Sequence, residues 1–100
     1  METYEVKLTP RALQDLDSIY AYIAQSLMEP DTALKLLSRL EDAIFSLEQL
    51  PQRGALRKTG AYANRDYRQI LIENYIAIYR VDEVHRQVIL LTVQYSHRKF

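Results

Sequence analysis

The residues best suited to chemistry are basic or phenolic, and they gather in the second half of the chain. Tyr95, His97 and Arg98 lie together near residue 100, and Arg68 precedes a run of apolar residues. Arginine binds phosphate, and histidine transfers protons near neutral pH. Such residues could hold a phosphodiester and stabilise a phosphorane without metal, with His97 as general acid. The alternative is a solvated, charged C-terminus, which composition alone favours.

A charge split supports a polyanion site in the same half. The whole chain has 13 basic and 13 acidic residues. Residues 1–50 carry four bases against nine acids, a net charge of −5, and residues 51–100 carry nine against four, a net charge of +5. Arg57, Lys58 and Arg65 fall in the basic half, among several tyrosines, and bases with aromatic rings are typical of RNA contacts. Solvated acidic helices and tyrosines that pack in strands would explain the pattern equally well.

Composition excludes several other chemistries. The chain has no cysteine, which rules out disulfides, thiol nucleophiles and cysteine zinc sites. Two separate histidines are poor material for a metal centre, and neither glycine begins a phosphate-binding motif. We therefore expect no metal and no cofactor. Acids on the predicted helices, such as Asp15 and Asp17, are expected to be solvated, as are Asp82 and Glu83 in a predicted turn.

Length and hydropathy indicate one small domain. One hundred residues with 48% hydrophobic and 26% charged residues suit a single globular domain over residues 1–100. The first residues contain no apolar stretch typical of a signal peptide, and no window approaches the length of a membrane span. We expect a cytoplasmic protein that does not bind membranes.

The first half of the chain predicts a strand and a helical hairpin. Residues 4–8 alternate apolar and polar side chains, which indicates a half-buried strand. Thr9 and Pro10 predict the start of a helix that runs to about residue 27. Residues 29–31 interrupt it, and a second amphipathic helix follows until Pro51.

The second half predicts a long loop and three strands. Residues 51–66 show no apolar period, and long loops in small domains are often functional. Residues 67–72, 75–81 and 87–95 are expected to be strands, the last two central and buried. Asn74 in the Glu73–Asn74 turn is the residue expected to tolerate positive φ. The prediction is an α+β fold with the order β-α-α-β-β-β.

With its elements in this β-α-α-β-β-β order, the sequence resembles the RelE/ParE superfamily of bacterial type II toxins over nearly all of its length. The matching segments are LTPRALQDLDSIYAYIA, ALKLLSRLEDAIFSLEQLPQRG, YRQILIENYIAIYRVDE and QVILLTVQYSHRKF. The resemblance implies a helical hairpin packed on a small, mostly antiparallel sheet. It also implies a toxin that a co-expressed antitoxin neutralises, in a toxin–antitoxin hetero-oligomer, and a role in plasmid stabilisation and growth arrest.

The resemblance implies two alternative targets. RelE-like members bind the ribosome and cut mRNA without metal, which inhibits translation, whereas ParE-like members inhibit DNA gyrase and lack the nuclease residues. By position, Arg68, Tyr95, His97 and Arg98 correspond to the catalytic set, and Arg57, Lys58, Arg65 and Arg80 to RNA-binding residues. One departure is Ile76, where nuclease members place arginine.

Three hypotheses follow. A ribosome-dependent mRNA endonuclease, the favoured one because YSHR supplies an acid–base group, requires Arg68, Tyr95, His97 and Arg98 to converge on one concave face. A gyrase inhibitor needs no such convergence, and Ile76 and the neutral net charge favour it. A domain that only binds an antitoxin and regulates transcription would not arrest growth. In each case an amphipathic antitoxin helix is expected to lie on an apolar patch between helical hairpin and sheet.

Overall fold

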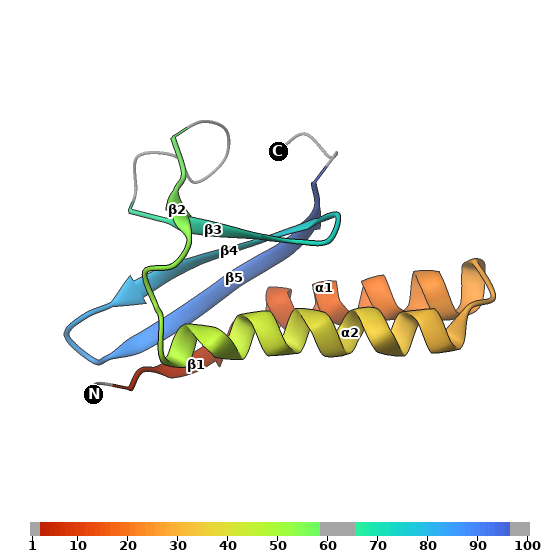
Figure 1. Cartoon of the computed structure of the whole chain (residues 1–100), viewed down its shortest axis with the longest axis horizontal. Helices are drawn as coiled ribbons and strands as arrows, with labels where there is room; N and C mark the ends of the chain where they lie inside the picture. Colours follow the sequence, from red (N-terminus) through yellow and green to blue (C-terminus); the bar gives the residue numbers. More distant parts are fainter. Residues whose placement is uncertain (1–2, 59–65, 97–100) are drawn as a thin grey trace.

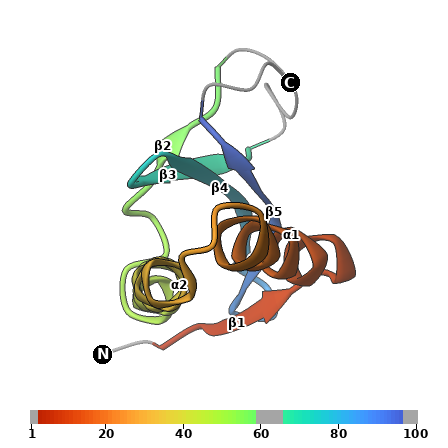
Figure 2. The same cartoon turned by 90° about the vertical axis from the view of Figure 1, so that its right-hand side faces the viewer.

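A computed structural model describes residues 3–58 and 66–96 of the chain. Two helices, α1 (Pro10–Ala21) and α2 (Pro30–Phe45), form a hairpin that packs on one face of a five-stranded sheet (Figures 1 and 2). The strands are β1 (Glu5–Leu8), β2 (Ala55–Leu56), β3 (Arg68–Ile72), β4 (Tyr75–Asp82) and β5 (Gln87–Tyr95), in the spatial order β1-β5-β4-β3-β2. Only β1 pairs in parallel, with β5, and the other described pairs are antiparallel. This architecture confirms the predicted α+β fold.

Local signals explain where the helices begin. The Thr9 hydroxyl accepts a hydrogen bond from the Ala12 amide at 3.1 Å, and Pro10 takes the first helical position, where its missing N–H costs nothing. The expected helix extends beyond α1 as a π-helical turn over Tyr22–Ser26. Pro30 begins α2, which ends in a 3₁₀ turn at Ser46–Glu48.

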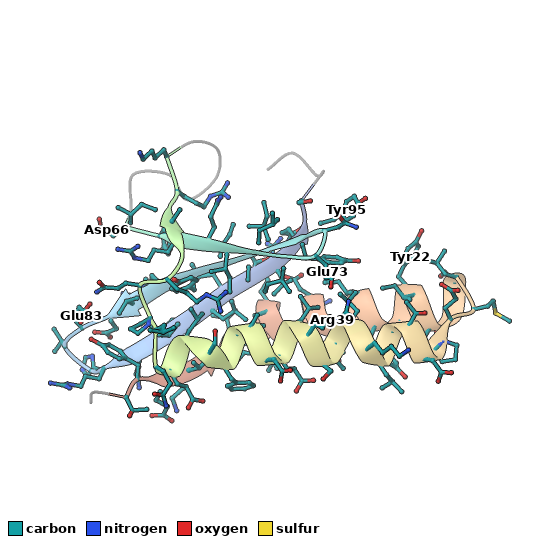
Figure 3. All side chains as sticks on the ribbon, viewed as in Figure 1. Tyr22, Arg39, Asp66, Glu73, Glu83 and Tyr95 are labelled. Atoms are coloured by element: carbon teal, nitrogen blue, oxygen red, sulfur yellow. The ribbon has the colours of Figure 1, made fainter. Side chains whose placement is uncertain are left out.

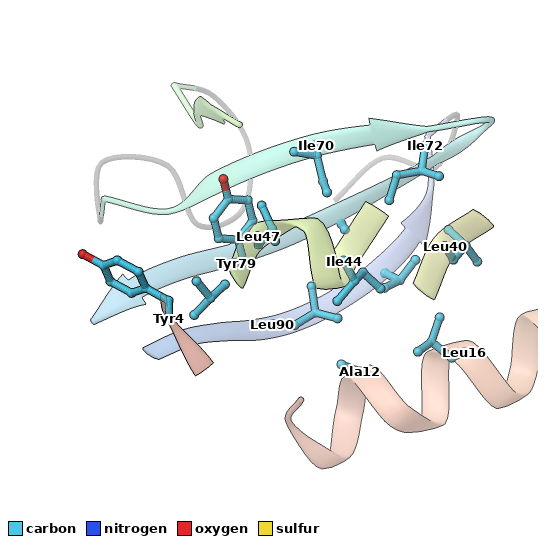
Figure 4. Packing of buried hydrophobic residues seen from close by; sticks show 13 residues of the cluster. Tyr4, Ala12, Leu16, Leu40, Ile44, Leu47, Ile70, Ile72, Tyr79 and Leu90 are labelled. Carbon is cyan, nitrogen blue, oxygen red and sulfur yellow. The ribbon is translucent and has the colours of Figure 1, made fainter. Parts of the chain in front are cut away.

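The core lies between the hairpin and the sheet (Figure 4). Leu40, Ile44 and Leu47 from α2 and its 3₁₀ turn are fully buried, together with Tyr79 from β4 and Leu90 from β5. Strands β4 and β5 occupy the interior of the sheet, as their apolar composition predicts. Their pairing is interrupted opposite Ile78 and Tyr79, where β5 carries one extra residue as a β-bulge.

Two local predictions were wrong. The segment expected to be wholly a loop contains β2, whose two residues pair with Gln69 and Arg68. A two-residue strand has no hydrophobic period, so pairing with β3 defines it rather than local sequence. In the β3–β4 turn the positive φ belongs to Glu73, at 54°, and not to Asn74. A positive φ at the first turn residue matches the twist of the flanking strands in hairpins of the II′ kind.

Candidate functional site

Arg68 lies on the face of the sheet that carries the core. Side chains alternate along β3, so Arg68 shares a side with the buried Ile70 and Ile72. Its guanidinium Nη1 donates to the Gly54 carbonyl at 2.7 Å and lies 3.4 Å from the Gln52 carbonyl. The charge of Arg68 is therefore used to hold the segment before β2 against the sheet.

Tyr95 lies at the opposite end of the sheet from Arg68. It pairs with Tyr75, which in turn pairs with Ile72 at the far end of β3, and the two phenol rings meet edge to face with centroids 5.7 Å apart. Four residues of strand separate Ile72 from Arg68, roughly 13 Å at the usual rise per residue. The structure does not bring Arg68 and Tyr95 to a shared phosphate position.

Arg57 and Arg80 occupy the other face of the sheet. The Arg57 amide donates to the Tyr67 carbonyl at 2.8 Å, and its guanidinium donates to Gln69 Oε1 at 2.7 Å. Continuing the β3–β4 register by one residue places Tyr67 between Arg57 and the exposed Arg80. Two guanidinium groups therefore flank a phenol on the face that points away from the helices, and the exposed Lys58 follows Arg57.

The same outer face is apolar toward the β3–β4 turn. Ile76 pairs with Leu71, whose side chain is 69% exposed, and with Gln94 on β5. Arg80 lies four residues farther along β4, which returns it to the same face but places it roughly 13 Å from Ile76. Arg80 therefore does not replace the arginine that nuclease members carry at the position of Ile76.

Three predicted site residues, Arg65, His97 and Arg98, lie outside the described residues. Among residues 3–58 and 66–96, no cluster of three or more histidines and acids is arranged to hold a metal ion. The helices within these ranges are too short or too polar to cross a membrane.

A groove lies between the hairpin and the sheet. Its volume is about 630 Å³, and its walls come from α1, the π-helical turn, β4 and β5. A second hollow of about 290 Å³, between α2 and the β3–β4 turn, shares Ile23 and Tyr75 with the first. The lining side chains of the larger hollow are mostly apolar or phenolic: Asp15, Ser18, Ile19, Tyr22, Ile23, Leu27, Tyr75, Val93, Gln94 and Tyr95.

Phenols line the groove, and charged side chains line the second hollow beside it (Figure 3). Burial raises the pKa of Tyr75, and the neighbouring Tyr95 and Tyr22 raise it further because each would place a second negative charge nearby. In the second hollow, Arg39 Nη1 and Glu73 Oε1 form an exposed ion pair at 2.5 Å. Tyr75 therefore stays neutral, and the site offers an apolar surface with a polar rim.

Asp15 was expected to be solvated, and this prediction was wrong. Its carboxylate accepts hydrogen bonds from the Thr92 hydroxyl and, at 3.1 Å, from the Val93 amide. Asp15 thereby fixes α1 on β5 and forms part of the groove wall. Asp82 is also engaged, because it accepts from the His85 amide at 3.2 Å and contacts His85 Nδ1 at 2.9 Å, and these bonds lower the Asp82 pKa.

Sequence reasoning missed the groove residues on α1. Asp15, Ile19 and Tyr22 follow one another at helical spacing, so they share one side of α1 and of the π-helical turn that continues it. That spacing is a usable signal, but it does not distinguish a surface groove from the core.

Comparison with known proteins places the fold and the family. A family model described as the ParE toxin of the type II toxin–antitoxin system parDE matches residues 6–100. A structure titled as the chromosomal ParDE system of P. aeruginosa matches with a TM-score of 0.75 and 25% identity, over 93% of this chain and 96% of that one.

Two further structures share the fold at lower identity. The RelBE2 complex of Mycobacterium tuberculosis matches with a TM-score of 0.68 and 23% identity, covering 93% and 98% of the two chains. The intact E. coli RelBE complex matches with a TM-score of 0.63 and 16% identity, over 95% of this chain and 99% of that one. No curated protein sequence matched. Because the family model covers almost the whole chain, this protein belongs to the ParE toxin family within the RelE/ParE superfamily of type II toxin–antitoxin toxins.

Proposed function

We propose that this toxin acts by binding DNA gyrase, as ParE-like members do, rather than by cutting mRNA. The observation that carries the proposal is the separation of Arg68 from Tyr95, the two expected catalytic residues within the described part of the chain. Arg68 is bonded to the Gly54 carbonyl on the core face, and Tyr95 lies at the other end of the sheet. The ParE family match and Ile76 on the outer face support the same conclusion.

The second candidate is the ribosome-dependent mRNA endonuclease favoured from the sequence. The outer-face pair Arg57 and Arg80, with Tyr67 between them, favours it, because arginines and a ring are the groups that bind a nucleotide strand. In this alternative His97 supplies the proton, and Arg98 assists it.

Two assays run side by side distinguish these candidates. In a supercoiling assay with purified gyrase, the toxin is expected to inhibit, and His97→Ala is expected to inhibit equally. In a purified translation system with one defined mRNA, primer extension is expected to show intact message. Discrete cleavage that needs ribosomes and disappears in His97→Ala, with gyrase unaffected, would contradict the proposal and establish the nuclease.

We further propose that an amphipathic helix of the cognate antitoxin occupies the groove. The toxin–antitoxin complexes among the structural relatives support an antitoxin partner, and the apolar walls suit the apolar face of a helix. Ser18→Arg would place a charged side chain at the rim of the groove, and Leu13→Arg, exposed on α1 away from the groove, is the matched control. We expect antitoxin affinity to fall by at least roughly tenfold only for Ser18→Arg. Equal affinity of the two variants in calorimetry would place the antitoxin elsewhere.

A further inference from the structure

The hairpin ends in a tip that projects beyond the strands (Figure 1). We define the hairpin tip as residues 22–31. Its backbone is held by hydrogen bonds at 3.0 Å from the Leu27 amide to the Tyr22 carbonyl and from the Glu29 amide to the Ile23 carbonyl. Met28 has a φ of 58°, in the left-handed region that side chains rarely adopt. The backbone of the tip is therefore a defined structure.

Large apolar side chains are exposed at this tip. The exposed fractions are 79% for Met28, 57% for Tyr22 and 48% for Leu27, and none of the three belongs to the buried core cluster. Exposed apolar side chains that sit together mark contact surfaces, and methionine adapts well to a partner pocket. Folding of this chain does not explain their placement.

Within the hairpin tip the charges are of one sign. Residues 22–31 contain two acids, Glu29 and Asp31, and no lysine, arginine or histidine, and the nearest base along the chain is the exposed Lys35 on α2. Both carboxylates are exposed. This surface repels nucleic acid and attracts a protein surface that carries lysine and arginine.

We propose that the hairpin tip is the surface through which the toxin contacts its protein target, with Met28 and Leu27 entering an apolar pocket bordered by basic side chains. The inference rests on the proposed function, because it assumes that the target is bound and not cut. Tyr22 and Leu27 also line the groove. An antitoxin helix in the groove would cover these two side chains, so antitoxin and target bind in competition.

The test uses the full-length toxin with purified gyrase. Met28→Asn removes the apolar side chain but suits the left-handed backbone, and Glu29→Gln combined with Asp31→Asn removes the charge. Val84→Asn is the matched control, because Val84 is 86% exposed in the β4–β5 turn, outside the hairpin. Antitoxin affinity is measured for every variant as a check of folding.

We expect the inhibitory concentration to rise by roughly tenfold or more for both tip variants, as for interface hot spots. Val84→Asn should match the wild type, and added salt should weaken wild-type inhibition more than that of the charge variant. Wild-type potency of a Met28→Asn variant that binds antitoxin normally would overturn the inference and leave the gyrase target intact.

If the wild-type toxin does not inhibit gyrase, growth arrest is used to test whether the tip contacts a different target. That result would refute the proposed target but not the tip. A Met28→Asn variant that binds antitoxin and no longer arrests growth would support the tip as the contact surface for another protein. A variant that arrests growth like the wild type would overturn it. If Met28→Asn loses antitoxin binding, the double variant Glu29→Gln, Asp31→Asn takes its place. Loss of growth arrest would then support the tip, and arrest like that of the wild type would overturn it.

Discussion

Removing one buried hydroxyl at Tyr79 should lower stability measurably. Tyr79 is fully buried, and its hydroxyl accepts a hydrogen bond from the buried Gly54 amide at 3.0 Å. Tyr79→Phe keeps the ring but leaves that amide without its acceptor. An unsatisfied buried donor costs about 1–3 kcal/mol, so we expect the free energy of unfolding to fall by about 2 kcal/mol.

The assay is thermal unfolding of the purified toxin followed by circular dichroism. For a domain of this size, 1 kcal/mol corresponds to about 4–8 °C in Tm, so the expected drop is about 10 °C. Tyr22→Phe removes the same atom at an exposed position and should change the free energy of unfolding by less than about 0.5 kcal/mol. A Tyr79→Phe variant within about 2 °C of the wild type would refute the reasoning, because the Gly54 amide would then be satisfied in another way.

Other substitutions and conditions test the packing of the same sheet. Gly54→Ala would place a Cβ 2.5 Å from the Gln69 carbonyl oxygen and 2.7 Å from the Tyr79 hydroxyl; we expect a loss of about 3 kcal/mol in denaturant unfolding, and a loss below about 1 kcal/mol would show that the strand can shift. Asp15→Ala should cost about 2 kcal/mol in the same assay, because the Val93 amide loses a charged acceptor, whereas Asp15→Asn, which keeps an acceptor, should cost less; equal losses would contradict this account. Burial raises the Tyr79 pKa above its ordinary value of 10.0, so the folded state holds this proton more tightly than the unfolded state. The contribution of this proton to the free energy of unfolding is complete below pH 10 and is lost as pH rises through the folded pKa of Tyr79. Across that pH range the free energy of unfolding should fall less steeply in Tyr79→Phe than in the wild type. Parallel plots of stability against pH for the two proteins would argue against this account.

Much of the fold follows from local sequence. Thr9 and Pro10 specify the start of α1 because capping involves only residues within one turn. Alternating side chains identify β3, β4 and β5 because a strand repeats every two residues. The strand β2 and the positive φ at Glu73 were not predictable, because both depend on a partner strand.

The candidate site depended on the tertiary structure far more. The sequence by itself determined which residue types were available: arginines, tyrosines and acids, without cysteine or a phosphate-binding glycine motif. It also determined that Ile76 stands where an arginine was expected. It could not show how Arg68 and Tyr95 are separated, because their distance is determined by the β3–β4–β5 register, which depends on how the three strands pair.

Only the tertiary structure decided what each charge does. Arg68 is bonded to the Gly54 carbonyl and Asp15 to the Val93 amide, and both partners are distant in sequence. The groove likewise exists only where α1 and its π-helical turn lie beside β4 and β5. Sequence patterns record which side of one element a residue occupies, but a binding surface depends on which elements meet there, and that follows from packing of the whole core.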